Sequence, residues 1–196
     1  WTEETPPLPD QSPSGAAWPR VTIVTPSYNQ GSFLEETIRS VLLQGYLDLE
    51  YIVIDGGSKD ESAAIIKKYE KWISYWVSEP DGGQTHAINK GFARSTGVYM
   101  NWLNSDDSFT AGALKSVVLA FLKDPQVGLV YGIGLAMDTQ GQCLWREDGP
   151  VMNRDCLFKW HKEFHFNQPA CLFSREAVEE AGGFLDESFQ FAMDLE

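Results

Sequence analysis

The sequence predicts an α/β fold built on a mostly parallel sheet that helices cover on both faces. First, short runs of β-branched and apolar residues recur along the chain, with the composition of strands buried on both faces. Second, most of these runs precede a segment whose apolar residues recur at near-helical spacing. Third, a hydrophobic content of 43% in 196 residues is enough for a sizeable core. Strand–helix alternation of this kind is typical of parallel sheets.

The predicted elements alternate regularly from residue 21 to residue 121. The expected strands span 21–25, 51–54, 75–77 and 98–103. The helical patterns that follow them occupy 33–42, 65–69, 87–93 and 114–121. In such sheets ligands bind at the carboxyl ends of the strands, so the turns after each strand are the first place to look for a site.

Beyond Gly128 the pattern is less regular. Further strands are expected at 129–131, 143–145 and 170–173, the first two antiparallel and joined through 138–141. A short helix at 175–181 is expected to end at Gly182 and Gly183. We therefore expect one domain over residues 20–196. Residues 1–19 are rich in Pro, Ser and acid and lack periodicity, which predicts an extended tail or linker outside the core.

The charge balance excludes some classes of partner. Lys+Arg 15 against Asp+Glu 28 gives a formal net charge of -13, so there is no broad positive field for nucleic acid or anionic lipid. No apolar run approaches the roughly 20 residues of a membrane-spanning helix. The three cysteines form no disulfide framework and have no zinc-finger spacing, which favours a reduced, cytoplasmic compartment.

Acidic residues follow the predicted strands directly. Asp55, Asp81 and the adjacent pair Asp106 and Asp107 lie at strand ends that converge on one crevice of a parallel sheet. Adjacent carboxylates repel each other unless a cation or a proton intervenes. Hard oxygen ligands suit Mg²⁺ or Mn²⁺, which typically also hold substrate phosphates. The alternative is a turn in which Asp106 caps a helix beginning near Thr110.

Other turns carry weaker signals. Tyr28 could stack on a base, or it could be a packing residue. Asp55 could accept a hydrogen bond from a base or sugar, or cap its own turn. Gly82 and Gly83 could cradle a phosphate, with Lys90 as a point charge. Neither a Walker pattern nor GxGxxG occurs, which disfavours a P-loop NTPase or a dinucleotide fold.

The motifs taken together are more specific than any one of them. The segments VTIVTPSYNQGSFLEETIRSVLLQ, YIVIDGGSKDES, EPDGGQTHAINKGFARSTGVYMNWLNSDD and NQPACLFSREAVEEAGGFLDESFQFAMDLE occur in this order. They resemble family 2 of the inverting nucleotide-sugar glycosyltransferases, which have the GT-A fold. The resemblance runs from Val21 to the end of the chain. It implies a GT-A-like, Rossmann-type sheet with a small antiparallel part on the acceptor side.

The resemblance also implies site residues. Those expected to contact the nucleotide-sugar donor are Thr25, Pro26, Tyr28, Asp55, Asn89, Lys90, Asn104, Ser105 and Gln168. The family's DxD-type element maps onto 104–106, which makes Asp106 the expected ligand of Mn²⁺ or Mg²⁺ and Asp107 a neighbour that binds through water. Asp194 lies where the family places its general base.

Two departures from the family pattern stand out. Asn104 replaces the first acid of the DxD-type element, which removes one negative charge. His86 lies where a small or acidic residue is expected. His161 and His165 are either an additional metal ligand or ordinary surface or core histidines.

The expected activity is inverting, metal-assisted transfer of a sugar, from a UDP-sugar in the first instance, to a hydroxyl acceptor such as a glycan or a lipid-linked sugar. By resemblance the setting is polysaccharide synthesis in the cytoplasm, with peripheral association at the inner face of the membrane. The alternatives are a catalytically silent nucleotide-sugar-binding module and a sugar nucleotidyltransferase. The latter needs a Gly-rich basic loop where this chain has 26–29. A catalytic domain of this family is expected to continue beyond Glu196.

Overall fold

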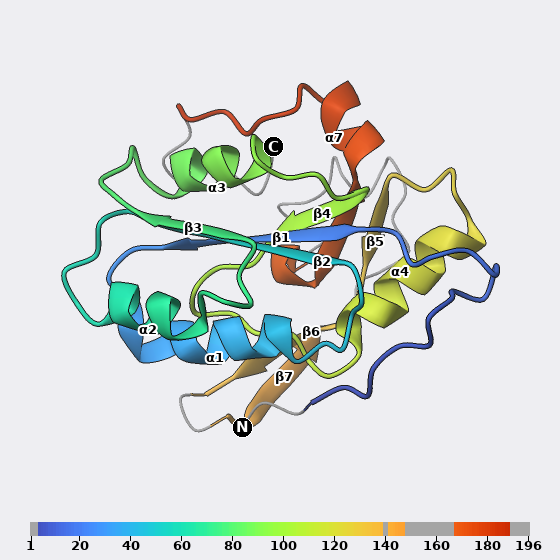
Figure 1. Cartoon of the computed structure of the whole chain (residues 1–196), viewed down its shortest axis with the longest axis horizontal. Helices are drawn as coiled ribbons and strands as arrows, with labels where there is room; N and C mark the ends of the chain where they lie inside the picture. Colours follow the sequence, from blue (N-terminus) through green and yellow to red (C-terminus); the bar gives the residue numbers. More distant parts are fainter. Residues whose placement is uncertain (1–3, 139–140, 148–166, 189–196) are drawn as a thin grey trace.

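A computed structural model describes residues 4–138, 141–147 and 167–188. Its centre is a six-stranded sheet with the strand order β3-β2-β1-β4-β8-β5 (Figure 1). Four neighbouring strands are parallel: β1 (Val21–Ser27), β2 (Leu49–Asp55), β3 (Tyr75–Ser78) and β4 (Tyr99–Trp102). β8 (Cys171–Ser174) is antiparallel to both β4 and β5 (Leu129–Tyr131). The predicted mostly parallel sheet is confirmed.

Strand β1 is the centre of the fold. All seven of its residues are buried, as its β-branched sequence predicts for a strand covered on both faces. The chain places β2 on one side of β1 and β4 on the other. The direction of strand addition therefore reverses next to β1, and a reversal of this kind opens a crevice at the carboxyl ends of the strands.

Helices cover both faces of the sheet (Figure 1). α1 (Gly31–Leu42), α2 (Ser62–Tyr69) and α4 (Ala113–Lys123) cover one face, and α3 (Gln84–Phe92) and α7 (Arg175–Glu180) lie over the other. Two buried apolar clusters, one on each side of the sheet, join these helices to it. In the described ranges no helix combines the length and the apolar character that crossing a bilayer requires.

The strands after Gly128 have partners that the sequence did not predict. Leu129–Tyr131 forms β5 of the main sheet, whereas Cys143–Glu147 (β7) pairs with β6 (Gly134–Met137) in a separate antiparallel ribbon. Both strands were expected, but their pairing with each other was wrong and β6 was missed. β6 begins with glycine and contains no β-branched residue, so its composition carries no strand signal. A short 3₁₀ turn, η1 (Gln168–Ala170), precedes β8.

The segment before residue 20 is extended, as predicted, but its described part is not outside the core. Leu8 and Trp18 are 5% and 4% exposed and belong to the larger apolar cluster. The backbone N–H of Thr5 donates to the carbonyl of Leu43 at 2.8 Å, and that of Leu8 to the carbonyl of Gly45 at 3.2 Å. Proline and polar residues prevent a helix or strand here, yet the scattered apolar side chains still bury themselves on the domain.

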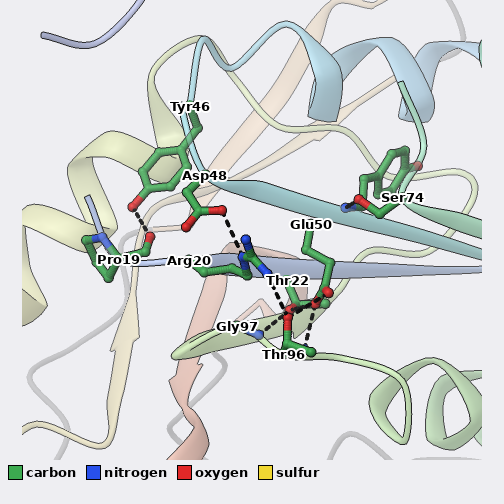
Figure 2. Close-up of polar contacts among 10 residues, drawn as sticks. Pro19, Arg20, Thr22, Tyr46, Asp48, Glu50, Ser74, Thr96 and Gly97 are labelled. Carbon is green, nitrogen blue, oxygen red and sulfur yellow. Dashed lines mark hydrogen bonds and ion pairs between the residues drawn. The ribbon is translucent and has the colours of Figure 1, made fainter. Parts of the chain in front are cut away.

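A polar network joins the amino ends of β1 and β2 to the turn before β4 (Figure 2). Glu50 accepts hydrogen bonds from the Thr22 hydroxyl at 2.5 Å and from the Thr96 amide and hydroxyl at 2.6 and 2.8 Å. Arg20 pairs with Asp48 at 2.8 Å and also donates to the Thr96 hydroxyl at 3.2 Å. Each polar group has its partner within the chain, which marks this end of the sheet as structural.

Candidate functional site

A pocket of about 660 Å³ lies at the carboxyl ends of the four parallel strands. Its walls come from the four turns that follow these strands, although the turns are far apart in the sequence. The lining residues are Pro26, Ser27, Tyr28, Gln30, Gly56, Pro80, Asp81, Gly83, Gln84, Ala87, Asn104, Ser105 and Asp106. This is the place where a sheet with a reversal beside its central strand is expected to bind a ligand.

The turn after β1 presents an aromatic ring to the pocket. Tyr28 is 63% exposed, so it is not the packing residue that the sequence left as an alternative. Asn29, with a φ of 52°, bends the backbone next to it. The Asn29 amide donates to the Ser58 hydroxyl at 2.8 Å, and its side-chain oxygen accepts from the Lys59 amide at 2.8 Å. The turn that carries Tyr28 is therefore held rigidly against the turn after β2.

Asp55 lies beneath the pocket rather than in its wall. Its carboxylate is fully buried and accepts from the Ser58 amide at 3.0 Å, the Ser58 hydroxyl at 2.5 Å and the Ser78 hydroxyl at 2.6 Å. These donors tie the ends of β2 and β3 together and shape the turn at Gly56, which does line the pocket. Groups of the chain itself already use the Asp55 oxygens, and its contact with a base stays a prediction.

Asp106 is the acidic group of the β4 turn that reaches the pocket. Its side chain is exposed, and within the described ranges no hydrogen bond or ion pair engages it. Asp107 is half-buried beside it. Burial and the negative charge of Asp106 raise the pKa of Asp107 to about 6. A hydrogen bond from Asn104 lowers the pKa but does not outweigh these two effects. The predicted repulsion between the two carboxylates is thus present, and a cation would relieve it.

Asn104 connects this turn to helix α3. The Gln84 side-chain amide donates to the Asn104 oxygen at 2.6 Å, and the Asn104 amide donates to Asp107 at 3.3 Å. An aspartate at this position could accept from Gln84 but could not donate to Asp107. Asn104, in place of the acidic residue expected here, therefore supplies a hydrogen-bond donor to the Asp107 carboxylate.

The alternative of Asp106 as a helix cap is wrong. α4 begins at Ala113, and its N-cap residue is Gly112 in the left-handed conformation, which has no side chain to cap the helix. Asp106 is thus several residues away from the start of the helix. Its carboxylate is free to face the pocket.

Asn89 and Lys90 lie on α3, away from the pocket wall. The side-chain amide of Asn89 donates to the Leu185 carbonyl at 2.8 Å and to the Glu187 carboxylate at 3.1 Å. Its side-chain oxygen accepts from the backbone N–H of Leu185 at 2.9 Å. Lys90 forms an ion pair with Glu79. Both side chains connect α3 to neighbouring segments in this structure, and neither lines the pocket.

Thr25 and Gln168 are also buried behind the site. The Thr25 hydroxyl shares a hydrogen bond with the Tyr51 hydroxyl at 3.0 Å. The Gln168 amide donates to the Asn101 side chain and to the carbonyl of Trp102, both at 2.9 Å. Gln168 thereby holds η1 against the end of β4, the strand that leads into the turn with Asp106. Asp194, His161 and His165 lie outside the described residues.

The pocket contains residues that the sequence did not single out, among them Gln30, Pro80, Gln84 and Ala87, beside Asp81 and Gly83, which it did. α3 begins at Gln84, three residues before the predicted start, because Gly83 with a φ of 110° makes the sharp entry. The first turn of α3 therefore reaches the pocket. His86 accepts from the Gly82 amide at 2.8 Å and so stabilises that entry. A Cβ at Gly56 would lie 3.0 Å from the Asp81 carboxylate, so a larger residue there would require the Asp81 side chain to shift.

The donor set fits a divalent cation shared with a ligand. Among the described residues no three His, Cys, Asp or Glu side chains group together as a complete metal site. Mg²⁺ and similar ions are commonly bound through one or two carboxylates, with waters and substrate phosphates completing the coordination. Asp106, with Asp107 behind it, matches this arrangement and does not match a closed structural site.

Solved structures with the same fold bind nucleotides and nucleotide-sugars. Residues 1–349 of S. aureus TarS, solved with UDP and also with UDP-GlcNAc, match 90% of this chain with a TM-score of 0.68 and 17% identity. The mannosyltransferase PcManGT from Pyrobaculum calidifontis, in complex with GDP-Man and Mn²⁺, matches 91% with a TM-score of 0.63 and 21% identity. The chain spans about half the length of these proteins, 53% and 50% respectively. At such identities the likeness concerns the fold.

Sequence relatives are closer. An uncharacterized glycosyltransferase of Mycobacterium tuberculosis is 34% identical over 180 residues, which is 91% of this chain and 67% of the relative. The O-antigen biosynthesis protein RfbC of Myxococcus xanthus is 30% identical over 179 residues, 89% of this chain but 14% of that protein. The family described as glycosyl transferase family 2 matches residues 22–182. The resemblance drawn from the motifs is thereby confirmed, and the chain belongs to glycosyl transferase family 2.

Proposed function

We propose that this chain is the catalytic domain of an inverting glycosyltransferase that moves a sugar from a nucleotide-sugar to a hydroxyl acceptor. The observation that carries the proposal is the joint placement of Tyr28 and Asp106 in one pocket. An exposed ring suits a nucleobase, and a free carboxylate suits a cation that holds the diphosphate. Family membership supports the same activity.

The proposed donor is a UDP-sugar. Pro26 and Tyr28 would contact the base, while Asn104 and Ser105, which line the pocket from the β4 turn, would bond the ribose or the diphosphate. Thr25, Asp55, Asn89, Lys90 and Gln168 would act from behind the wall, holding the turns and α3 in place. The TarS complexes support UDP, and the GDP-Man complex of PcManGT makes GDP-sugars the donors to compare with it.

The proposed cation is Mn²⁺ or Mg²⁺, held by Asp106 with Asp107 as its neighbour. A bound divalent cation stabilises the negative charge of a departing nucleoside diphosphate. Asp106 can supply a ligand without losing an internal hydrogen bond, because no described group engages it. Asn104 keeps Asp107 in place through its amide.

Asp194 is the proposed general base. An acceptor hydroxyl is a poor nucleophile, and a carboxylate within hydrogen-bond reach takes its proton as attack proceeds. A single displacement from the face opposite the diphosphate inverts the anomeric carbon. This mechanism needs one base and no second acidic nucleophile.

The proposed setting is surface polysaccharide synthesis. The likeness to an O-antigen biosynthesis protein supports a glycan or a lipid-linked sugar as acceptor. A cytoplasmic location, with peripheral association at the inner face of the membrane, belongs to the same proposal.

A thermal-shift screen of nucleoside diphosphates and their sugars, with and without Mn²⁺, tests the proposal. A ligand that binds only the folded state at about 100 times its Kd adds about 2.7 kcal/mol to the unfolding free energy, which raises Tm by roughly 5–10 °C in a domain of this size. UDP with Mn²⁺ should give such a shift. If no nucleotide shifts Tm, the proposed function is wrong. Binding of UDP-sugars without any transfer in the full protein would indicate the silent module instead.

A further inference from the structure

Helix α1 and the turn that directly follows it carry buried polar side chains on one side. Thr37, Ser40 and Gln44 are 1%, 2% and 2% exposed, and they follow each other at intervals of three and four residues. We call these three residues the α1 polar stripe. A helix face packed against a core is normally apolar, because a buried polar group costs free energy unless it is hydrogen-bonded. The stripe must therefore have partners.

Two of its hydrogen bonds are local, from the Ser40 hydroxyl to the Thr37 carbonyl at 2.8 Å and from the Gln44 side chain to the Ser40 carbonyl at 2.9 Å. Its other partners lie in one segment, the turn between β4 and α4 together with the first turn of α4. The Thr37 hydroxyl donates to the carbonyl of Asp107 at 2.8 Å, and the Ser40 hydroxyl accepts from the amide of Phe109 at 3.1 Å. The Gln44 side chain donates to the carbonyl of Thr110 at 3.0 Å and accepts from the amide of Leu114 at 3.2 Å. Three side chains thus hold the backbone of the turn from residue 107 onward and the start of α4, as far as residue 114.

The turn makes few backbone hydrogen bonds of its own. In the described ranges these are Asp107 to Asn104 at 3.1 Å and Ala113 to Thr110 at 3.2 Å. Other backbone groups of the turn bond to distant parts of the chain; the Gly112 amide, for example, donates to the Thr5 hydroxyl at 2.8 Å. Asp106, which lines the pocket, directly precedes Asp107, the first residue whose backbone the stripe holds. The position of Asp106 therefore depends on a segment that α1 fixes from outside the pocket.

We propose that the α1 polar stripe is a set of positioning residues that hold the Asp106 turn in the geometry in which it binds a divalent cation together with a nucleoside diphosphate. This inference rests on the proposed function. None of the three side chains lines the pocket, so the stripe acts through the backbone of the turn and does not touch the ligand. Proper placement of a ligand carboxylate requires such a supporting layer.

The test compares Thr37→Val, which removes the hydroxyl at nearly constant size, with Thr37→Ser, which keeps it. UDP affinity is measured by titration calorimetry in MnCl₂ and again in EDTA, and the ratio of the two is the Mn²⁺ enhancement. Loss of one hydrogen bond of this kind is worth about a fivefold change, so Thr37→Val should lose about fivefold of the enhancement, with affinity in EDTA unchanged. Thr37→Ser should restore it. Ser40→Ala should act in the same direction and replaces Thr37→Val if that variant does not fold.

Thr22→Val is the matched control at the other end of the sheet. Thr22 is also a fully buried threonine; it donates to Glu50 and accepts from the Gly97 amide at 2.9 Å. This control should lower Tm but keep the full Mn²⁺ enhancement. The inference is overturned if Thr37→Val and Ser40→Ala keep the enhancement, or if Thr22→Val loses as much. If the wild-type protein binds UDP equally in MnCl₂ and in EDTA, the cation site itself is wrong, and so is the role of the stripe.

Discussion

Strand β2 carries an acidic residue near each of its ends, Glu50 at the amino end and Asp55 at the carboxyl end. Both accept three hydrogen bonds from the chain, Glu50 from Thr22 and Thr96 (Figure 2) and Asp55 from Ser58 and Ser78. Asp106, on the turn after β4, is exposed and lines the pocket. An acidic residue at a strand end is therefore not itself a sign of a site; what matters is whether the chain already uses its oxygens.

The two ends of the sheet differ in the same way as these carboxylates. At the amino end, Arg20, Asp48, Glu50 and the threonines satisfy one another. At the carboxyl end, Tyr28 and Asp106 face a pocket. Changes at the carboxyl end should reduce ligand binding and sugar transfer with little effect on stability. Changes at the amino end should lower stability with little effect on ligand binding.

The largest effect is expected from Asp194→Asn in the full protein. Removal of a general base typically lowers the rate by about 10²–10⁴-fold. UDP affinity should stay unchanged, because a general base acts on the acceptor hydroxyl and not on the nucleotide. Steady-state transfer rates and calorimetric UDP affinity measure the two effects. A variant that transfers sugar at the normal rate would show that the base has been assigned to the wrong residue.

Asp106→Asn should separate metal-dependent from metal-independent binding. It removes the charge that holds the cation, so transfer should fall by roughly 10²-fold or more, as when a charge-stabilising group is lost. UDP should bind equally in Mn²⁺ and in EDTA. Tm should change little, since the side chain is exposed and has no described partner. Unchanged Mn²⁺-dependent binding in calorimetry would exclude the metal site.

Tyr28→Ala tests the base-stacking surface. Loss of an aromatic stacking partner costs about 1–3 kcal/mol, so UDP should bind roughly 5- to 150-fold more weakly. Tyr28→Phe keeps the ring and is the matched control, with affinity close to wild type. The free energy of unfolding should be nearly unchanged for both, because the side chain is 63% exposed. Equal affinities for the Ala and Phe variants would mean that the ring does not contact the ligand.

Glu50→Gln tests the amino end. It keeps the shape but removes the charge that accepts from Thr22 and Thr96. The expected loss is about 1–2 kcal/mol of unfolding free energy, which lowers Tm by roughly 2–8 °C. UDP affinity and its Mn²⁺ enhancement should match the wild type. A clear loss of UDP binding in a folded Glu50→Gln protein would break the distinction between the two ends.

The smallest effect concerns pH. Burial raises the pKa of Glu50, but the hydrogen bonds from Thr22 and Thr96 outweigh it and leave the pKa below its ordinary value of 4.5. Because the folded-state pKa is depressed, this stabilisation is present above about 4.5 and is lost as pH falls through the lower folded value. The stability difference between wild type and Glu50→Gln should therefore shrink in urea unfolding below pH 4.5. A constant difference down to pH 3 would contradict the role of the Glu50 charge.

The parallel half of the fold could be predicted because its signals are local. β-branched runs such as 51–54 and the turn residues after them define strands and their ends, and strand ends define where a pocket forms. Pro26, Tyr28 and Asp106 line the pocket for this reason. The start of α3 was placed late, since the entry through Gly83 depends on a backbone conformation that composition alone does not reveal.

Other features depend on tertiary contacts and could not be predicted. The burial of Leu8 and Trp18 requires a surface that only the folded domain provides. The pairing of β6 with β7 has no composition signal in β6. The difference between Asp55 and Asp106 is of the same kind: both follow buried strands in the sequence, but only packing shows that Ser58 and Ser78 already occupy the oxygens of Asp55.

The most direct test of the contrast between the two ends is an NMR titration of the ¹⁵N-labelled protein with UDP and diamagnetic Mg²⁺. Amide shifts should change in the four turns of the pocket, at 26–30, 56–57, 80–87 and 104–107. The amides of Thr22, Glu50 and Thr96 should remain in place, because that network lies at the opposite end of the sheet. Shifts centred on the amino-end network, or none in the pocket turns at saturating UDP and Mg²⁺, would contradict the account.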